Sequence, residues 1–243
     1  MLGELRPIHF GTDLIFPPLN ISTEVFLQKH RSRIKQVFDK VRSEKGIDFN
    51  KMDVDAPLGP HLWTRRPSGY MTSYSFLSDR IQARDEWTER TLDDFAREVR
   101  EVVDVCFRVF NIPVVVMQSC VIRATAKPHG YDDSRDFLFD HGLNLSGERV
   151  TELFGRPAHV AGISITFPLL KDVPDEQRVR IESYAADPSL LFMEVHSIFR
   201  ANPIPATNEA QLETNLKDCY DFMESRVRAF VDSLFEVKGE DTQ

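Results

Sequence analysis

Cysteine is scarce in this chain. Only Cys106, Cys120 and Cys219 occur, and no two of them are close in sequence. An odd number of widely spaced cysteines fits neither a disulfide framework nor a cysteine-based zinc site. We therefore expect three small buried thiols in a reducing compartment, because free cysteine packs as a small hydrophobic residue.

Long apolar runs and familiar catalytic signatures are also missing. No window approaches the roughly 18 apolar residues of a membrane span, and residues 1–10 lack the basic and apolar regions of a signal peptide. The Gly-x-Ser-x-Gly, phosphate-loop and Rossmann glycine patterns do not occur. The sequence thus predicts a cytoplasmic protein and gives little support to hydrolase, nucleotidase or dehydrogenase chemistry.

Composition sets the next limits. Hydrophobic residues make up 42% of the 243, which is enough for a soluble protein to bury most of its unfolded surface in a core. The formal net charge is −8, so the chain as a whole repels polyanions and wholesale nucleic-acid binding is disfavoured. Binding of that kind would require a local basic patch.

The periodicity of apolar residues repeats one order of elements. Alternating or wholly apolar stretches predict strands, and spacings of three and four predict helices with one apolar face. The first half contains a strand, a helix, a hairpin and a long helix, at residues 8–16, 24–44, 70–77 with 80–87, and 92–109. The second half contains a strand, a short helix, three strands and a long helix, at residues 114–124, 146–154, 162–167, 178–185, 190–199 and 212–234.

This repeated order predicts an α+β fold. The expected units are residues 1–112 and 113–243, each a long helix laid over the apolar face of an antiparallel sheet, as in helix-grip or TBP-like proteins. Two such sheets side by side could form one continuous sheet. In the last helix the apolar face is expected at positions 212, 216, 219, 223, 227, 230 and 234.

Local features accompany this layout: Pro7-Ile8 in the first strand, Trp87 before the first long helix, Val-Ile-Arg at 121–123 and Phe230 in the closing helix. With the layout, they resemble a sporadically distributed bacterial family of two-lobed proteins whose function is unknown. Ala124-Thr125 replaces the Tyr or Asn that the family often carries near the end of its middle strand, and Met223 stands where it has a His. The resemblance implies a fold and no activity.

One polar segment, residues 127–144, interrupts the second half. It gathers two imidazoles and four carboxylates, a donor set that suits zinc, manganese or non-haem iron: His129, Asp132, Asp133, Asp136, Asp140 and His141. Their spacing matches no established metal motif. The segment is either a solvated acidic loop, which needs no cofactor and is the interpretation we favour, or the site of a metal-assisted hydrolase.

A basic helix is the second candidate site. It carries seven cations within 17 residues, and two neighbouring arginines could extend the patch: Lys29, Arg31, Arg33, Lys35, Lys40, Arg42 and Lys45, with Arg65 and Arg66. Such a stripe could track phosphates weakly and without sequence preference. A solvated helix face explains the same residues, and the aromatic side chains that single-strand binders use are absent from it.

Two histidines have simpler expected roles. His30 falls on the apolar face of its helix, where a core imidazole bonded to a backbone carbonyl is the expected arrangement. His196 alternates with Glu194 on one strand face, which predicts polar contacts across strands rather than an acid–base pair.

These observations favour a binding or interaction protein without catalytic activity. The partner is another protein or a second copy of the chain, and the contact surface is the basic helix or an exposed sheet edge. The alternatives are the metal-assisted hydrolase that uses residues 129–141 and the weak polyanion binder that uses residues 29–45. A small molecule held between helix and sheet is a further hypothesis.

Overall fold

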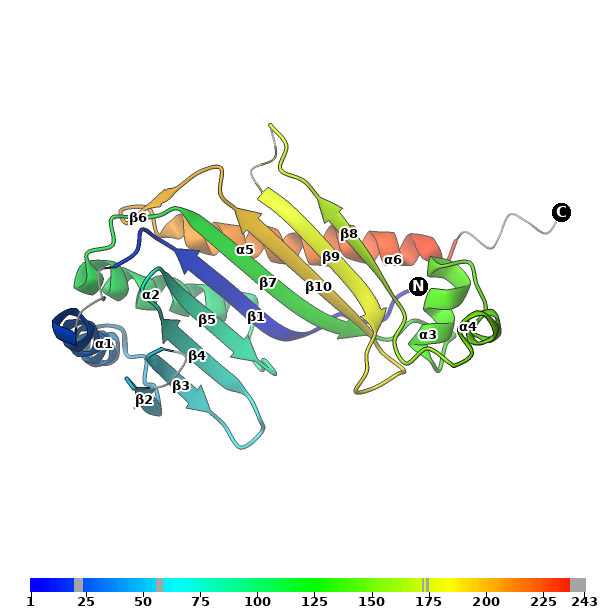
Figure 1. The fold of residues 1–243 in the computed structure, drawn as a ribbon, viewed down its shortest axis with the longest axis horizontal. Coiled ribbons are helices and arrows are strands. Elements are labelled where there is room, and N and C mark those ends of the chain that lie inside the picture. The colour runs from blue at the N-terminus through cyan, green and yellow to red at the C-terminus, as the bar shows by residue number, and fades with distance from the viewer. Residues whose placement is uncertain (20–23, 56–58, 172, 174, 237–243) are drawn as a thin grey trace.

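Nine antiparallel strands form a single twisted sheet, and the long helices lie on one of its faces (Figure 1). This computed structural model describes residues 1–19, 24–55, 59–171, 173 and 175–236. The fold is α+β, as the sequence predicts.

The strand order divides at the centre of the sheet. From edge to edge it is β2-β3-β4-β5-β1-β7-β10-β9-β8, so the strands of the first half lie on one side of the β1–β7 pair and those of the second half on the other. One continuous sheet therefore contains the strands of both halves. The strand bounds are Arg6–Ile15 (β1), Lys51–Asp53 (β2), His61–Arg65 (β3), Met71–Phe76 (β4), Arg80–Glu86 (β5), Met117–Ala126 (β7), Gly162–Phe167 (β8), Asp175–Ser183 (β9) and Leu191–Phe199 (β10).

Side chains alternate between a helix-covered face and an open face. In β4, Thr72, Tyr74 and Phe76 are buried, while the residues between them are half-buried. This is the alternation expected of a strand with one face on the core. The open face consequently carries mostly polar and charged side chains.

The helices pack on the sheet and on one another. Their bounds are Glu24–Lys45 (α1), Leu92–Phe110 (α2), Ala210–Phe222 (α5) and Arg228–Leu234 (α6), with a π-helical turn, η2, over Met223–Val227. Helix α2 packs against both α1 and α5, and α5 also packs on β7 and β10. Phe10 of β1 contacts Phe95 of α2 and Tyr220 of α5, with ring centroids 5.8 and 6.2 Å apart. The two long helices therefore cover a sheet, as predicted, and do not pack only on each other.

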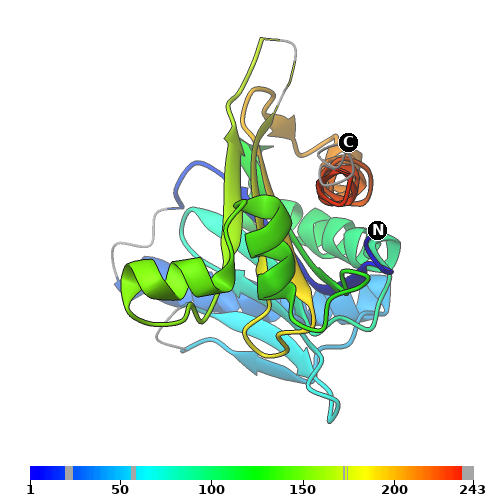
Figure 2. The ribbon, with the colours of Figure 1, turned by 90° about the vertical axis from the view of Figure 1, so that its right-hand side faces the viewer.

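Segment 127–144 differs from the predicted polar loop. It forms helix α3 (Ser134–Phe137) and a π-helical turn, η1 (Leu138–Gly142), followed by α4 (Gly147–Phe154). Phe137, Leu138 and Phe139 are buried, and their burial anchors the segment to the protein. Figure 2 shows α4 projecting on the side of the sheet opposite α5 and α6.

Other predictions are confirmed or corrected by the same contacts. All three cysteines are free and buried. His30 is buried, and its Nε2 lies 3.5 Å from the Phe76 carbonyl oxygen, as expected of a core imidazole. The predicted strand 114–124 is interrupted at Val116, because Val114–Val115 (β6) leaves the main sheet to pair with Ile204–Pro205 (β11). Among the described residues, no helix is long and apolar enough to span a bilayer.

Candidate interaction surface

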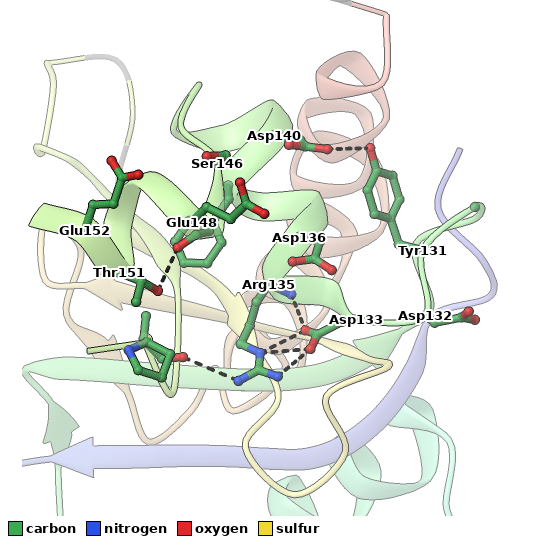
Figure 3. A pocket seen from close by; sticks show the side chains of 15 residues that line it. Tyr131, Asp132, Asp133, Arg135, Asp136, Asp140, Ser146, Glu148, Thr151 and Glu152 are labelled. Carbon is green, nitrogen blue, oxygen red and sulfur yellow. Dashed lines mark hydrogen bonds and ion pairs between the residues drawn. The ribbon is translucent and has the colours of Figure 1, made fainter. Parts of the chain in front are cut away.

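The acidic segment borders a wide, open hollow of about 1050 Å³ between α3, η1 and α4 (Figure 3). Asp133 caps α3 and forms an ion pair with Arg135, which holds the pKa of the carboxyl below its usual range. The hydroxyl of Tyr131 donates to Asp140, with 3.5 Å between the oxygens. Asp132 projects into solvent and Asp136 is exposed. The carboxylates line one hollow but serve different local roles.

The two imidazoles of this segment also lie in different surroundings. His129 is exposed. His141 has its Nε2 2.7 Å from the Tyr131 hydroxyl, and its ring packs 5.3 Å from that of Phe137. Across the residues that the structure describes, no three His, Cys, Asp or Glu side chains are grouped so as to hold a metal ion.

Much of the charge on α1 is balanced by nearby acids. Four of its seven cations form ion pairs at 2.8–3.5 Å: Arg31 with Asp55, Lys40 with Glu44, Arg42 with Asp48 and Lys45 with Asp104. Within the described part of the chain, no ion pair is found for Lys29, Arg33 or Lys35. Arg65 is exposed on β3, and the guanidinium of Arg66 lies 5.1 Å above the Tyr70 ring.

The open face of the sheet carries a lattice of polar contacts between strands. Arg123 of β7 donates to Glu194 of β10 at 2.6 Å, and Ser119 lies 2.7 Å from Nε2 of His196. These are the contacts across strands that the alternation of His196 with Glu194 predicts. His9 of β1 is buried among them, and this burial, reinforced by nearby arginines, lowers its pKa to about 3. The imidazole is therefore neutral at pH 7.

A buried polar cluster lies on the other face, between β4, β5 and α2. Asp85 is fully buried, and among the described residues neither of its carboxylate oxygens has a hydrogen-bond partner of standard geometry; Arg90 Nε is 3.8 Å from Oδ2. Arg90 donates to Glu98 at 2.8 Å, and Glu98 accepts from the Tyr74 hydroxyl at 3.1 Å. Burial raises the pKa of Asp85 to about 7, against the attraction of Arg90. Sequence alternation places Asp85 on this face but gives no sign of the cluster.

The edge strand β8 combines a lack of charge with exposed apolar neighbours in the sequence. Its sequence is Gly-Ile-Ser-Ile-Thr-Phe, and no charged residue occurs from Val160 to Leu170. Among the described residues, β9 is the only strand that pairs with it (Figure 1). Exposed apolar side chains occur in α4, just before β8, at the last residue of β8 and in the β8–β9 hairpin: Leu153, Phe154, Val160, Phe167, Leu169, Leu170 and Val173. Phe154 is 74% and Leu170 60% exposed, so these side chains are available for contact.

The opposite edge of the sheet is built differently. Strand β2 has three residues, and two of them, Lys51 and Asp53, are charged. Short, charged edge strands are the usual protection against unwanted strand pairing. Strand β8 lacks both protections, and its six uncharged residues offer a template for another strand.

A search with models of known protein families and a search of curated proteins return no match to this chain.

Proposed function

We propose that the chain is a binding protein without catalytic activity that captures an extended protein segment along β8. The observation that carries the proposal is the uncharged β8 edge bordered by exposed apolar side chains. An added strand would gain main-chain hydrogen bonds from β8, and the neighbouring apolar residues would select alternate side chains. The proposed partner segment is therefore uncharged, extended and apolar at every second position.

The proposed scaffold for this edge is a pair of tandem helix-grip-like units, residues 1–112 and 113–243. The strand order supports it. Counted outward from the centre, the two sets are β1-β5-β4-β3 and β7-β10-β9-β8. In each set the first strand that its half contributes to the main sheet lies innermost, and the later strands follow in reverse chain order. Each half also ends in a long helical segment. A continuous sheet with one face covered by helices would hold β8 in place at its edge.

The two sequence-based alternatives receive less support. A polyanion binder would rely on α1, where neighbouring acids already balance four cations. A metal-assisted hydrolase would rely on residues 129–141, whose acidic side chains serve as a helix cap and as acceptors for Arg135 and Tyr131. In both places many of the polar side chains are already engaged in contacts within the chain, whereas the outer edge of β8 has no paired strand among the described residues.

The experiment is a titration with a labelled peptide of the sequence 160–170, extended by lysines at its ends for solubility. We expect saturable binding by fluorescence anisotropy. Hydrogen–deuterium exchange should show new protection at residues 162–167 and none at 51–53, because only the first edge is uncharged. A control peptide with Glu at the positions of Ile163, Ile165 and Phe167 should not bind. Absence of saturable binding to a monomeric chain, or protection elsewhere, would show that the proposed function is wrong.

A further inference from the structure

The sequence of β8 is complementary to itself. When two antiparallel strands pair, directly opposite residues point to the same face of the sheet. If two copies of β8 pair about a two-fold axis at Ile165, Ile163 lies opposite the partner's Phe167 on the helix-covered face. On the open face, Ser164 lies opposite the partner's Thr166. Apolar residues thus meet apolar residues, and hydroxyl groups meet hydroxyl groups.

The same register continues beyond the strand. Val160 would lie opposite the partner's Leu170, and both side chains are exposed in the single chain. The hairpin end of one copy would therefore approach the start of β8 in the other. Because no charged residue occurs between Val160 and Leu170, this register places no like charges opposite each other.

We propose, on the basis of the function proposed above, that the segment captured by β8 is β8 of a second copy, in the register centred on Ile165. The pairing is isologous, as a two-fold dimer requires, because each copy uses the same edge. The product is one sheet of twice nine strands in which the charged β2 edges lie at the two outer ends. Further growth by strand addition is blocked there.

Charge variants on the open face test the pairing without disturbing the core. Ser164 and Thr166 are exposed and lie opposite Arg180 and Arg178 of β9. In the Ser164→Glu/Thr166→Glu variant, each new carboxylate meets an arginine within its own chain and a like charge in the paired copy. We expect analytical ultracentrifugation to show a wild-type dimer, with self-association at least about tenfold weaker in the variant.

Two matched controls accompany this variant. Met52→Glu, on the opposite edge, should leave the dimer unchanged. Mixing the double-Glu variant with the Ser164→Lys/Thr166→Lys variant should restore a dimer, because opposite charges then face each other across the axis. Equal dimerisation of the wild type and both charged variants would refute the proposed interface.

Cysteine cross-linking tests the register. Ile165→Cys places two thiols directly opposite, with a Cα separation of about 4.5–5.5 Å that suits a disulfide. Ile163→Cys places them roughly 13 Å apart along the strands and should not cross-link. The native thiols are buried and will not compete. Cross-linking of Ile163→Cys rather than Ile165→Cys would overturn the register.

The outcome for the wild-type chain separates this inference from the proposed function. A chain that stays monomeric and yet binds the 160–170 peptide at β8 would refute the second copy as partner and leave the proposed function standing. A monomeric chain that binds no peptide would refute both.

Discussion

The buried carboxyl group of Asp85 makes a quantitative prediction about stability. Asp85 lies under α2 with no solvent exposure, and its nearest cation is Arg90, whose Nε is 3.8 Å from Oδ2. Burial penalises the charged carboxylate more than Arg90 stabilises it, so the pKa rises from 3.8 to about 7. The change we consider is Asp85→Asn, which keeps the shape of the side chain and removes its titration.

The sign of the effect follows from proton linkage. The unfolded chain releases the Asp85 proton near pH 4, whereas the folded chain keeps it until about pH 7. Between these values folding takes up a proton, so the contribution of Asp85 to the free energy of unfolding falls as the pH rises. The pKa differs by about 3 between the two states, and each pKa unit corresponds to ~1.4 kcal/mol. The free energy of unfolding is therefore reduced by about 4 kcal/mol above pH 7, and this reduction is absent below pH 4.

The Asp85→Asn variant should therefore gain stability relative to the wild type as the pH rises from about 4 to 8, by up to about 4 kcal/mol. Urea unfolding at several pH values, followed by circular dichroism, measures the difference in free energy directly. Asp132→Asn is the control, because it makes the same chemical change on a side chain that projects into solvent. A constant difference for Asp85→Asn would refute the reasoning.

Three further substitutions test other parts of the structure. His9 has a pKa lowered to about 3, so its contribution to stability is complete above about pH 6.5 and is lost as the pH falls; His9→Gln should reduce the loss of stability on acidification, as measured by urea unfolding. The Thr91 hydroxyl caps α2 by accepting from the Asp94 amide, and Thr91→Ala should cost about 1 kcal/mol and lower the Tm in calorimetry. Gln118 is buried and bonds to Thr12, Leu212 and Asn215, so Gln118→Ala should leave several buried groups without partners and cost roughly 2–4 kcal/mol by the same urea assay.

The opposed titrations of Asp85 and His9 have a combined effect. Between about pH 4 and 6.5, the Asp85 contribution falls and the His9 contribution rises with nearly the same slope, since each involves one proton. These two contributions should therefore largely cancel each other in this range. The Asp85→Asn variant should then show the pH dependence of unfolding free energy that His9 contributes, and His9→Gln should show the one that Asp85 contributes.

Strands with one buried face were predictable because alternation is a local property of the sequence. The hairpin of β4 and β5, the short helix predicted over 146–154 and the core role of His30 all follow from neighbours within a few residues. The last helix shows the limit of this reasoning. The π-helical turn η2 changes the phase of the helix, so Val231 is buried and Phe230 and Leu234 are only partly buried.

Features that depend on strand order could not be predicted. The sequence of β8 alternates like that of an internal strand, and only the topology places it at an edge with apolar residues exposed. The prediction of a polar loop over 127–144 is wrong for a similar reason. The buried residues of this segment, Phe137 to Phe139, find their core partners in distant parts of the chain, including Phe235, whose ring lies 4.6 Å from that of Phe137.

The two halves of the sheet differ in what lies beyond their fourth strand from the centre. In the first half this strand is β3, which pairs on its outer side with β2, where Lys51 and Asp53 end the sheet. In the second half it is β8, and the described chain provides no strand in the position that β2 fills. In the proposed dimer the partner's β8 fills that position. Removing the charges from β2 should therefore allow this edge to pair with another strand. The variant Met52→Ile with Lys51→Thr and Asp53→Thr should associate through β2. When it also carries Ser164→Glu/Thr166→Glu, the chain should associate through β2 instead of β8.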